Sequence, residues 1–316
     1  MSKRTKIFIA ILLVVIAAVV LYFVLSPSKS TEVQAEAIET QSYEAEVAQE
    51  QATICGWLEL PAVDGESEFV VTHRAEMGGV LQRNYTLSYD AERYAANWVA
   101  YPLCADHMAK GREEDWGYDP QIPQDRQTSV RSGYGASIPT ANYPKNFYAR
   151  GHQLPNADRS AVPEMMAQTY YSTNMTPQIQ NGFNGAIWAK LEDAVRGAVP
   201  AGDTLYIITG AVFSRAGYDD QVKTVVNKND AKVLPVPNFY WKALLKVKRD
   251  GGNIVGAQTI GFWLPHEDLK GHSYADYSVS VDQIEQMSGL DLFPNLPDNI
   301  ESSAETQTSF QTFKSY

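Results

Sequence analysis

After residue 68, the order of apolar and polar positions predicts several strands and few helices. Strand-like alternation or β-rich composition covers six segments: 69–73, 84–89, 96–103, 204–213, 239–248 and 253–264. The turn Asp250-Gly251-Gly252 separates the last two, so we expect them to pair as a hairpin. Residues 105–147 are rich in Pro, Gly, Asp and Tyr and show little periodicity, which predicts a long loop.

Helical spacing occurs in two segments, 182–197 and 280–288. In the first, apolar residues recur at every fourth position and form a stripe that is typical of a helix packed beside a sheet: Phe183, Ile187, Leu191 and Val195. Residues 280–288 predict a short helix. Together these patterns predict an α+β fold, with a mixed or antiparallel central sheet and flanking helices.

The amino-terminal segment predicts a membrane anchor. A basic leader precedes Ile7–Leu25, a run of 19 residues without a charge, which as a helix would span roughly 28 Å and could cross a bilayer. Because the run ends without a convincing cleavage site, residues 1–25 favour an uncleaved signal anchor over a removed signal peptide. The positive-inside rule then places the remaining chain outside the cytoplasm, in the periplasm or extracellular space, and a cleaved segment would make the protein secreted.

Composition divides the rest of the chain. Residues 26–52 predict an acidic flexible linker, since residues 31–52 contain six glutamates and no lysine or arginine. Residues 53–300 hold the predicted folded domain, and residues 301–316 are predicted to be a polar tail. From residue 53 onward, 22 basic groups face 31 acidic ones. This balance counts against a protein that coats nucleic acid by bulk electrostatics, although it leaves room for an enzyme that contacts a few phosphates.

Two cysteines occur, Cys55 and Cys104. Outside the cytoplasm they could form a disulfide that stabilises the fold by about 4 kcal/mol, and the alternative is two buried free thiols. The sequence contains no Cys-x-x-Cys, His-Glu-x-x-His or Walker-type glycine loop. Zinc and ATP chemistry are therefore disfavoured.

Candidate chemistry begins with His152, which follows Arg150 and Gly151 in what we expect to be a tight turn. With an unperturbed pKa near about 6.5, a neutral imidazole can accept a proton from water. The other four histidines have no comparable neighbours, and we interpret them as surface or packing residues: His73, His107, His266 and His272.

The second candidate element is the polar stripe of the helix predicted at 182–197. Its members recur at intervals of four: Asn184, Trp188, Glu192 and Arg196. Such a stripe places an amide, a carboxylate and a guanidinium along neighbouring faces of one helix. Alone, it is also typical of an ordinary amphipathic helix.

Together the two elements resemble the DNA/RNA non-specific endonucleases, the ββα-metal nucleases. That family has an Asp-Arg-Gly-His turn followed by an Asn-x-x-x-Trp-x-x-x-Glu helix. Further blocks resemble the family in the same order: 85–88, 97–101, 172–178, 240–242 and 281–297. The resemblance spans about residues 80–297 and implies a ββα-metal nuclease fold.

The resemblance also implies roles for individual residues. His152 matches the general base, and Asn184 matches the direct ligand of Mg²⁺, with Mn²⁺ as an alternative ion. Glu192 would hold the ion through a bound water molecule. The remaining matches would neutralise phosphate charge or order the site: Arg196, Arg150, Arg112 and Asn174. DNA and RNA are the implied substrates, cut with little sequence preference because these residues contact phosphate and not bases.

One position departs from the family pattern, because Ala149 stands where the motif has Asp. An alanine accepts no hydrogen bond from metal-bound water, so we expect a different or weaker metal shell. The base, ligand and helical carboxylate all persist, which favours an active enzyme. The alternative is a catalytically impaired surface protein of the same fold that binds nucleic acid or a protein partner.

Overall fold

The computed structural model describes residues 57–62 and 68–316. The predicted anchor at 1–25, the predicted linker at 26–52 and Cys55 lie outside these residues. Cys104 carries a free thiol, with Sγ 3.6 Å from Nδ1 of His107. Within the described part of the chain, no helix is long and apolar enough to cross a membrane.

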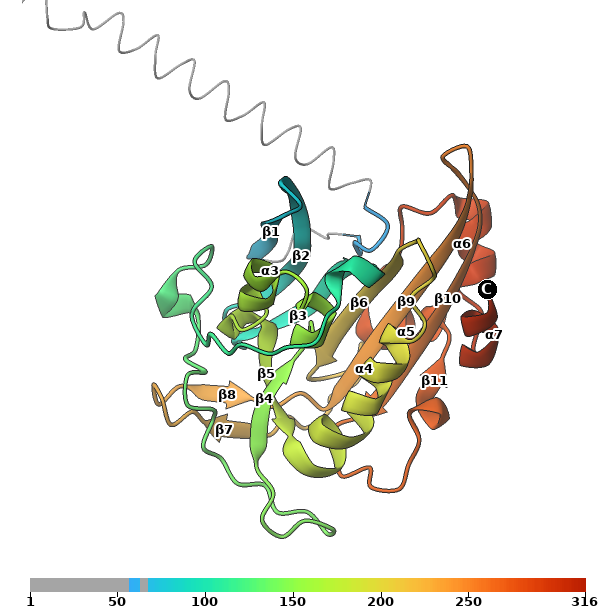
Figure 1. The fold of residues 1–316 in the computed structure, drawn as a ribbon. Helices are drawn as coiled ribbons and strands as arrows, with labels where there is room; N and C mark the ends of the chain where they lie inside the picture. Colours follow the sequence, from blue (N-terminus) through green and yellow to red (C-terminus); the bar gives the residue numbers. More distant parts are fainter. Residues whose placement is uncertain (1–56, 63–67) are drawn as a thin grey trace, which may run out of the picture. The chain divides into compact units, whose positions relative to one another are not determined.

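A seven-stranded antiparallel sheet forms the centre of the fold (Figure 1). Its strands lie in the order β1-β2-β3-β6-β9-β10-β11. Their bounds are Phe69–Met77, Val80–Asp90, Ala95–Leu103, Leu205–Val212, Phe239–Asp250, Asn253–Pro265 and Ser278–Val279. All six predicted strands are therefore confirmed, and the α+β class with them. The predicted loop at 105–147 is also confirmed, since it contains only the short helical turns Ala105–His107 and Gln124–Arg126.

Two glycine pairs set the hairpins of this sheet. Gly78 and Gly79 join β1 to β2, with φ angles of 62° and 78°. Gly251 and Gly252 join β9 to β10, with φ angles of 55° and 94°. A two-residue hairpin loop of this kind needs positive φ at both central residues, which glycine adopts without steric cost. The local sequence thus determines the register of both hairpins.

Helices cover both faces of the sheet. On one face lies α4 (Ala189–Arg196), and Lys242 of β9 reaches the ring of Trp188 just before this helix. On the other face, Ile284 of α5 (Val281–Ser288) packs over Gly261 of β10, so closely that a Cβ there would lie 2.6 Å from its Cδ1. Because helices cover both faces, β6 and the first nine residues of β9 are almost entirely buried.

The carboxyl-terminal residues correct one prediction. Instead of a polar tail, they contain the end of α6 (Asp298–Ala304) and all of α7 (Phe310–Ser315). Phe313 is fully buried, and the ring of Phe310 meets that of Phe262 edge-on at 5.2 Å. Two phenylalanines three residues apart make one apolar face on a polar segment, and this face is buried against β10.

Several short elements complete the fold. A two-stranded antiparallel ribbon is formed by β4 (Tyr148–His152) and β5 (Met175–Ile179), and α3 (Pro163–Gln168) lies between them in the chain. A second ribbon is formed by β7 (Thr224–Val226) and β8 (Val233–Pro235). Single helical turns occur at Asn156–Arg159, Ser172–Asn174 and Tyr274–Tyr277.

Candidate active site

The expected tight turn at His152 is wrong, because residues 148–152 form strand β4. Gly151 pairs with Thr176 of β5, and its φ is not positive. The glycine is needed for a close approach instead: a Cβ at Gly151 would lie 2.2 Å from Cδ of Gln178, whose side chain is fully buried. The ribbon therefore holds His152 at the end of β4, and the absence of a side chain at Gly151 lets the two strands approach.

His152 lies among aromatic rings and cationic side chains. Its ring centroid is 5.5 Å from that of Trp116 and 5.3 Å from that of Tyr170. Burial, together with the nearby charges of Arg112 and Arg150, lowers the pKa of His152 to about 3. The imidazole is consequently neutral at pH 7. Its Nε2 atom is buried and has no hydrogen-bond partner among the described residues, so it is a free proton acceptor.

The two arginines are held by the loop that precedes β4. The guanidinium of Arg150 stacks on Trp116 at 3.6 Å and donates to the backbone oxygens of Val130 and Arg131. Arg112 is exposed and pairs with Glu114, N to O 3.0 Å. Exposed pairs of this kind contribute little to stability. Arg112 can therefore exchange its carboxylate partner for an incoming anion at low cost.

The predicted helix at 182–197 is continuous only in its second half. Residues Gln180–Trp188 form an irregular helical segment with non-helical backbone angles at three positions: Asn181, Gly182 and Gly185. The apolar stripe nevertheless packs as expected, since all four of its members are buried. Asn184 lies within this irregular start, and its Nδ2 donates to Oε1 of Gln180 at 3.0 Å. Its Oδ1 accepts no hydrogen bond from the described residues.

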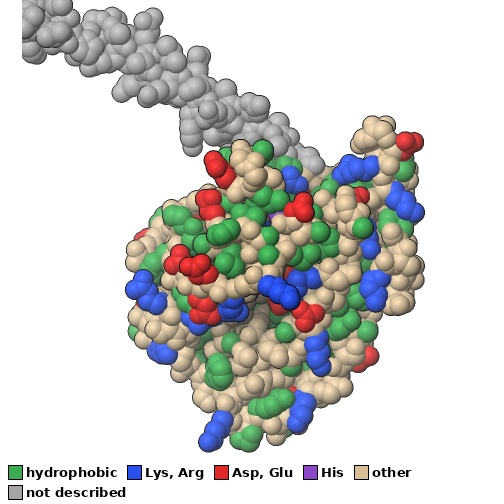
Figure 2. Space-filling view, viewed as in Figure 1, with side chains coloured by type: hydrophobic (Ala, Val, Ile, Leu, Met, Phe, Trp, Pro, Cys, Tyr) green, Lys and Arg blue, Asp and Glu red, His purple; other side chains and the backbone are tan. Residues whose placement is uncertain are grey.

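A cavity of about 880 Å³ joins the two elements. Its wall includes Asn184, Gln180, Ala149, Arg150 and Arg112. The position at which this chain departs from the family motif thus shares a wall with the predicted metal ligand. Figure 2, drawn from the side that carries α4, shows basic and acidic side chains intermixed on this face. No extended basic patch is visible on this face, and the cavity wall itself supplies Arg112, Lys145, Arg150 and Lys228.

Glu192 lies with a different set of partners. Burial raises the pKa of this carboxyl, and the attraction of Lys242 opposes the shift. Lys242 is itself buried, and its Nζ donates to the backbone oxygen of Gln153 at 3.4 Å. Because Gln153 follows His152, Lys242 links the helical carboxylate to the end of β4.

Arg196 and Asn174 are both engaged in the fold. Arg196 donates to Asp158 at 2.8 Å and also pairs with Asp193. Asn174 is fully buried, donates to the backbone oxygens of Leu154 and Thr169 at 2.9 and 2.8 Å, and accepts from the amide of Leu154. Asn174 therefore braces the chain directly after His152 and does not face the cavity.

The structure brings the predicted residues into two neighbouring groups. Asn184, Arg150 and Arg112 line the cavity, whereas Glu192 and Arg196 belong to the buried charge network around Asp158. Sequence reasoning missed Asp158, Lys242, Gln180 and Gln178. Lys242 and Gln178 lie in blocks that resemble the family, yet the sequence does not assign either of them a contact, and Asp158 acquires its role from a partner 38 residues away. The other four histidines pack or lie on the surface as predicted; His73, for example, stacks on Tyr85.

The residues fit a divalent cation. The Oδ1 of Asn184 and the half-buried carboxylate of Glu192 are oxygen donors of the kind that Mg²⁺ accepts while it keeps most of its water. The cavity beside Asn184 leaves room for that water. A two-stranded ribbon with a free imidazole, followed by a helical segment with such an amide, is the arrangement that the resemblance to the ββα-metal nucleases implies for this site.

Comparisons with known proteins agree with this class. Residues 71–299 match the family described as DNA/RNA non-specific endonuclease. A nuclease of Nostoc sp. is 29% identical over 233 residues, which cover 72% of this chain and 77% of the relative. A nuclease of Serratia marcescens is 29% identical over 232 residues, covering 72% and 79%. The chain belongs to the DNA/RNA non-specific endonuclease family and is an enzyme of the nuclease class.

A solved structure supports the fold separately. The chain resembles a structure described as the EndoG/EndoGI complex, with a TM-score of 0.57 and 22% sequence identity. The match covers 76% of this chain and 90% of the other. At this identity the likeness concerns the arrangement of the sheet and helices.

Proposed function

We propose that this protein is an endonuclease of the ββα-metal type that uses Mg²⁺ to hydrolyse phosphodiester bonds of DNA and RNA with little sequence preference. The observation that carries the proposal is the free Nε2 atom of His152 beside Arg150 and Arg112, both of which line the cavity with Asn184. The cavity wall thus offers two cations and an amide side chain to a phosphate, and the ring of His152 lies 5.5 Å from that of Trp116, which also lines this wall.

In this proposal His152 removes a proton from the attacking water. Its low pKa in the free protein arises from burial and from two cations. A bound phosphate diester would neutralise part of that positive charge and raise the pKa of His152 toward a value suited to a base. Substrate binding would thus activate the imidazole.

Asn184 would bind the cation through Oδ1, and Gln180 would orient the amide by accepting from Nδ2. The cation, when bound, supplies charge that stabilises the phosphate and the leaving 3′ oxygen. Glu192 would accept a hydrogen bond from water in the cation's shell. With one direct protein ligand, most of the shell is water, which favours Mg²⁺, with Mn²⁺ as the alternative.

The arginines would share the charge of the reacting phosphate. Arg112 is exposed and its ion pair with Glu114 is a weak surface contact, so it can bind phosphate directly. Arg150 would hold the phosphate beside the aromatic wall. Arg196 is already paired with Asp158 and Asp193, and we propose that its main contribution is to hold Asp158 near Glu192.

Digestion of supercoiled plasmid and of total RNA tests the proposal. The wild type should cut both with Mg²⁺ and neither with EDTA. His152→Ala should reduce the rate by about 10²–10⁴, the usual contribution of a general base. Asn184→Ala should raise the Mg²⁺ concentration required. As matched controls, His272→Ala and Asn299→Ala remove an exposed histidine and an exposed asparagine, and both should cut at the wild-type rate.

Two outcomes would contradict the mechanism. Full activity in chelator would show that no cation is required, and cutting by His152→Ala at the wild-type rate would show that His152 is not the base. Binding of DNA without turnover in saturating Mg²⁺ would instead favour a catalytically impaired surface protein that keeps the fold.

We also propose that the enzyme acts outside the cytoplasm, held by residues 7–25. This rests on the sequence alone, because these residues lie outside the described part of the chain. Fractionation and protease accessibility of intact cells test the location, and the mass of the mature amino terminus distinguishes an anchor from a cleaved signal. A soluble cytoplasmic enzyme would contradict the proposal.

A further inference from the structure

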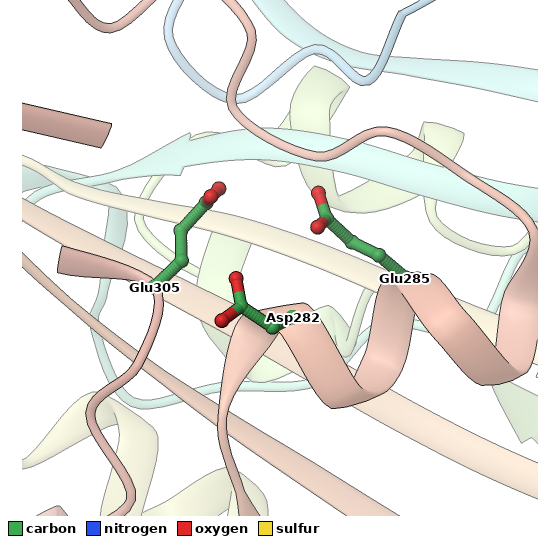
Figure 3. A group of neighbouring side chains, drawn as sticks. All are labelled: Asp282, Glu285 and Glu305. Carbon is green, nitrogen blue, oxygen red and sulfur yellow. The ribbon is translucent and has the colours of Figure 1, made fainter. Parts of the chain in front are cut away.

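Three carboxylates that the proposed reaction does not use converge at the junction of α5 and α6. Asp282 and Glu285 lie in α5, and Glu305 directly follows α6. Each offers one oxygen, and these oxygens lie within 4.8 Å of one another. Figure 3 shows the three side chains turned toward a common space. None of them lines the cavity that contains Asn184.

Burial makes this group unusual. The side chain of Glu305 is only 6% exposed, and within the described residues its Oε1 atom has no hydrogen-bond partner. Glu285 is half-buried, and one of its oxygens accepts from the amide of Leu292 at 2.7 Å. Asp282 lies at the surface. A buried carboxylate oxygen without a partner costs free energy unless a proton or a cation satisfies it.

The charged groups around Glu305 do not supply a partner for its unpaired oxygen. Burial and four other carboxylates, of Glu285, Glu301, Asp282 and Asp291, raise the pKa of Glu305 to about 8. The pKa of Glu285 is raised to about 7 by the same causes, against its hydrogen bond with Leu292. The charged groups that shift these two pKa values most are thus acidic. Within the described part of the chain, neither Glu285 nor Glu305 forms an ion pair with an arginine or lysine.

Three convergent carboxylates are ligands typical of Ca²⁺, which binds about six to eight oxygens and takes several carboxylates directly. Mg²⁺ dehydrates reluctantly and usually keeps several water molecules, with only one or two carboxylates bound. We propose that Asp282, Glu285 and Glu305 bind a Ca²⁺ ion that fastens the carboxyl-terminal helices to α5.

The same junction carries the backbone contact between these helices. The amide of Val281, the first residue of α5, donates to the backbone oxygen of Glu305 at 3.0 Å. The carboxylate and the carbonyl of one residue thus both meet the start of α5. Binding of Ca²⁺ would hold the end of α6 in place and, with it, the segment that leads to α7. The proposed site is therefore structural and separate from the reaction.

The test uses the full chain with Asn184→Ala, which removes the cation ligand of the proposed active site. Calorimetric titration with CaCl₂ alone should give one binding site. At a Ca²⁺ concentration about 100-fold above the dissociation constant, the melting temperature should rise by about 5 °C or more. Titration with MgCl₂ should give weaker binding at this site.

Glu305→Gln in the same background supplies the decisive variant. It keeps the shape of the side chain and removes one buried charge, so without Ca²⁺ it should melt no lower than its parent, and Ca²⁺ should no longer raise its melting temperature. Glu267→Gln removes an exposed carboxylate elsewhere and should keep the full response. Absence of Ca²⁺ binding in the Asn184→Ala protein, undiminished binding in Glu305→Gln, or equal affinity for Mg²⁺ would overturn the proposal.

Discussion

The contact of Gly151 with Gln178 makes a quantitative prediction for Gly151→Ala. An added methyl group would lie 2.2 to 2.5 Å from three atoms of the Gln178 side chain, whereas ordinary contacts begin at 3.4 Å. The nearest of these contacts would be more than 1 Å shorter than an ordinary contact. Because Gln178 is fully buried, its side chain cannot simply turn into solvent. We therefore expect β4 and β5 to move apart.

Overpacking of this kind costs about 1–3 kcal/mol. For a domain of this size, that corresponds to a fall in melting temperature of roughly 3–10 °C. The effect on catalysis should be larger in proportion, because His152 is the next residue and a displacement of about 1 Å can lower a rate by about 10²-fold. The variant should fold and bind nucleic acid, yet cut it slowly.

A double-mutant cycle isolates the cause. Gly151→Ala, Gln178→Ala and the double variant are compared by urea unfolding and by plasmid cutting. If the contact is responsible, Gln178→Ala should recover part of the lost stability, with a coupling energy of about 0.5–3 kcal/mol. Gly117→Ala is the matched control, since a Cβ there meets nothing within 4 Å. Additive effects, or a Gly151→Ala protein as stable and active as the wild type, would refute the reasoning.

Three further predictions concern the cavity, the carboxyl terminus and pH. Ala149→Asp puts a carboxylate on the wall shared with Asn184 and should lower the Mg²⁺ concentration for half-maximal cutting by about tenfold; an unchanged Mg²⁺ requirement would contradict it. Phe313→Ala should lower the free energy of unfolding by about 3–5 kcal/mol in urea, and a loss below about 1 kcal/mol would show that α7 is not part of the core. Burial lowers the pKa of His266 to about 4, and its Nε2 accepts from the amide of Ile179. The imidazole of His266 binds a proton near pH 6.5 in the unfolded chain and only near pH 4 in the folded chain. The free energy of unfolding therefore decreases as the pH is lowered from about 6.5 to about 4, by at most about 3 kcal/mol. His266→Gln should flatten this part of the pH profile, and an unchanged slope would assign the loss to other groups.

Local pattern was sufficient for much of the fold. Strands β9 and β10 and their Gly251-Gly252 turn were predictable because alternation, composition and turn chemistry agree over a long segment. The β4–β5 ribbon was not predictable, because a five-residue segment that contains a glycine, such as β4 with Gly151, is equally compatible with a turn. Helix α7 was missed because its apolar face consists of two phenylalanines in a polar segment, and only the adjacent sheet edge shows that they are buried.

Family resemblance assigned His152 and Asn184, and the structure puts both beside the same group of arginines. It could not reveal that Arg196 is already paired with Asp158, or that Lys242 links Glu192 to the residue after His152. These partners are 38 or more residues apart in the chain. A sequence motif records the identity and spacing of side chains within one segment, and it contains no information on which distant charge will lie opposite.

The sequence by itself determined the α+β class, the family and the two segments that carry the proposed chemistry, because periodicity, turn residues and motif spacing are properties of neighbours along the chain. Only the tertiary structure decided that Gly151 serves close packing, that Asn184 leaves the regular helix to face a cavity, and that Glu305 is buried among carboxylates. Burial and the electric field at a side chain depend on elements that fold against it. They can be assigned only after those elements are placed.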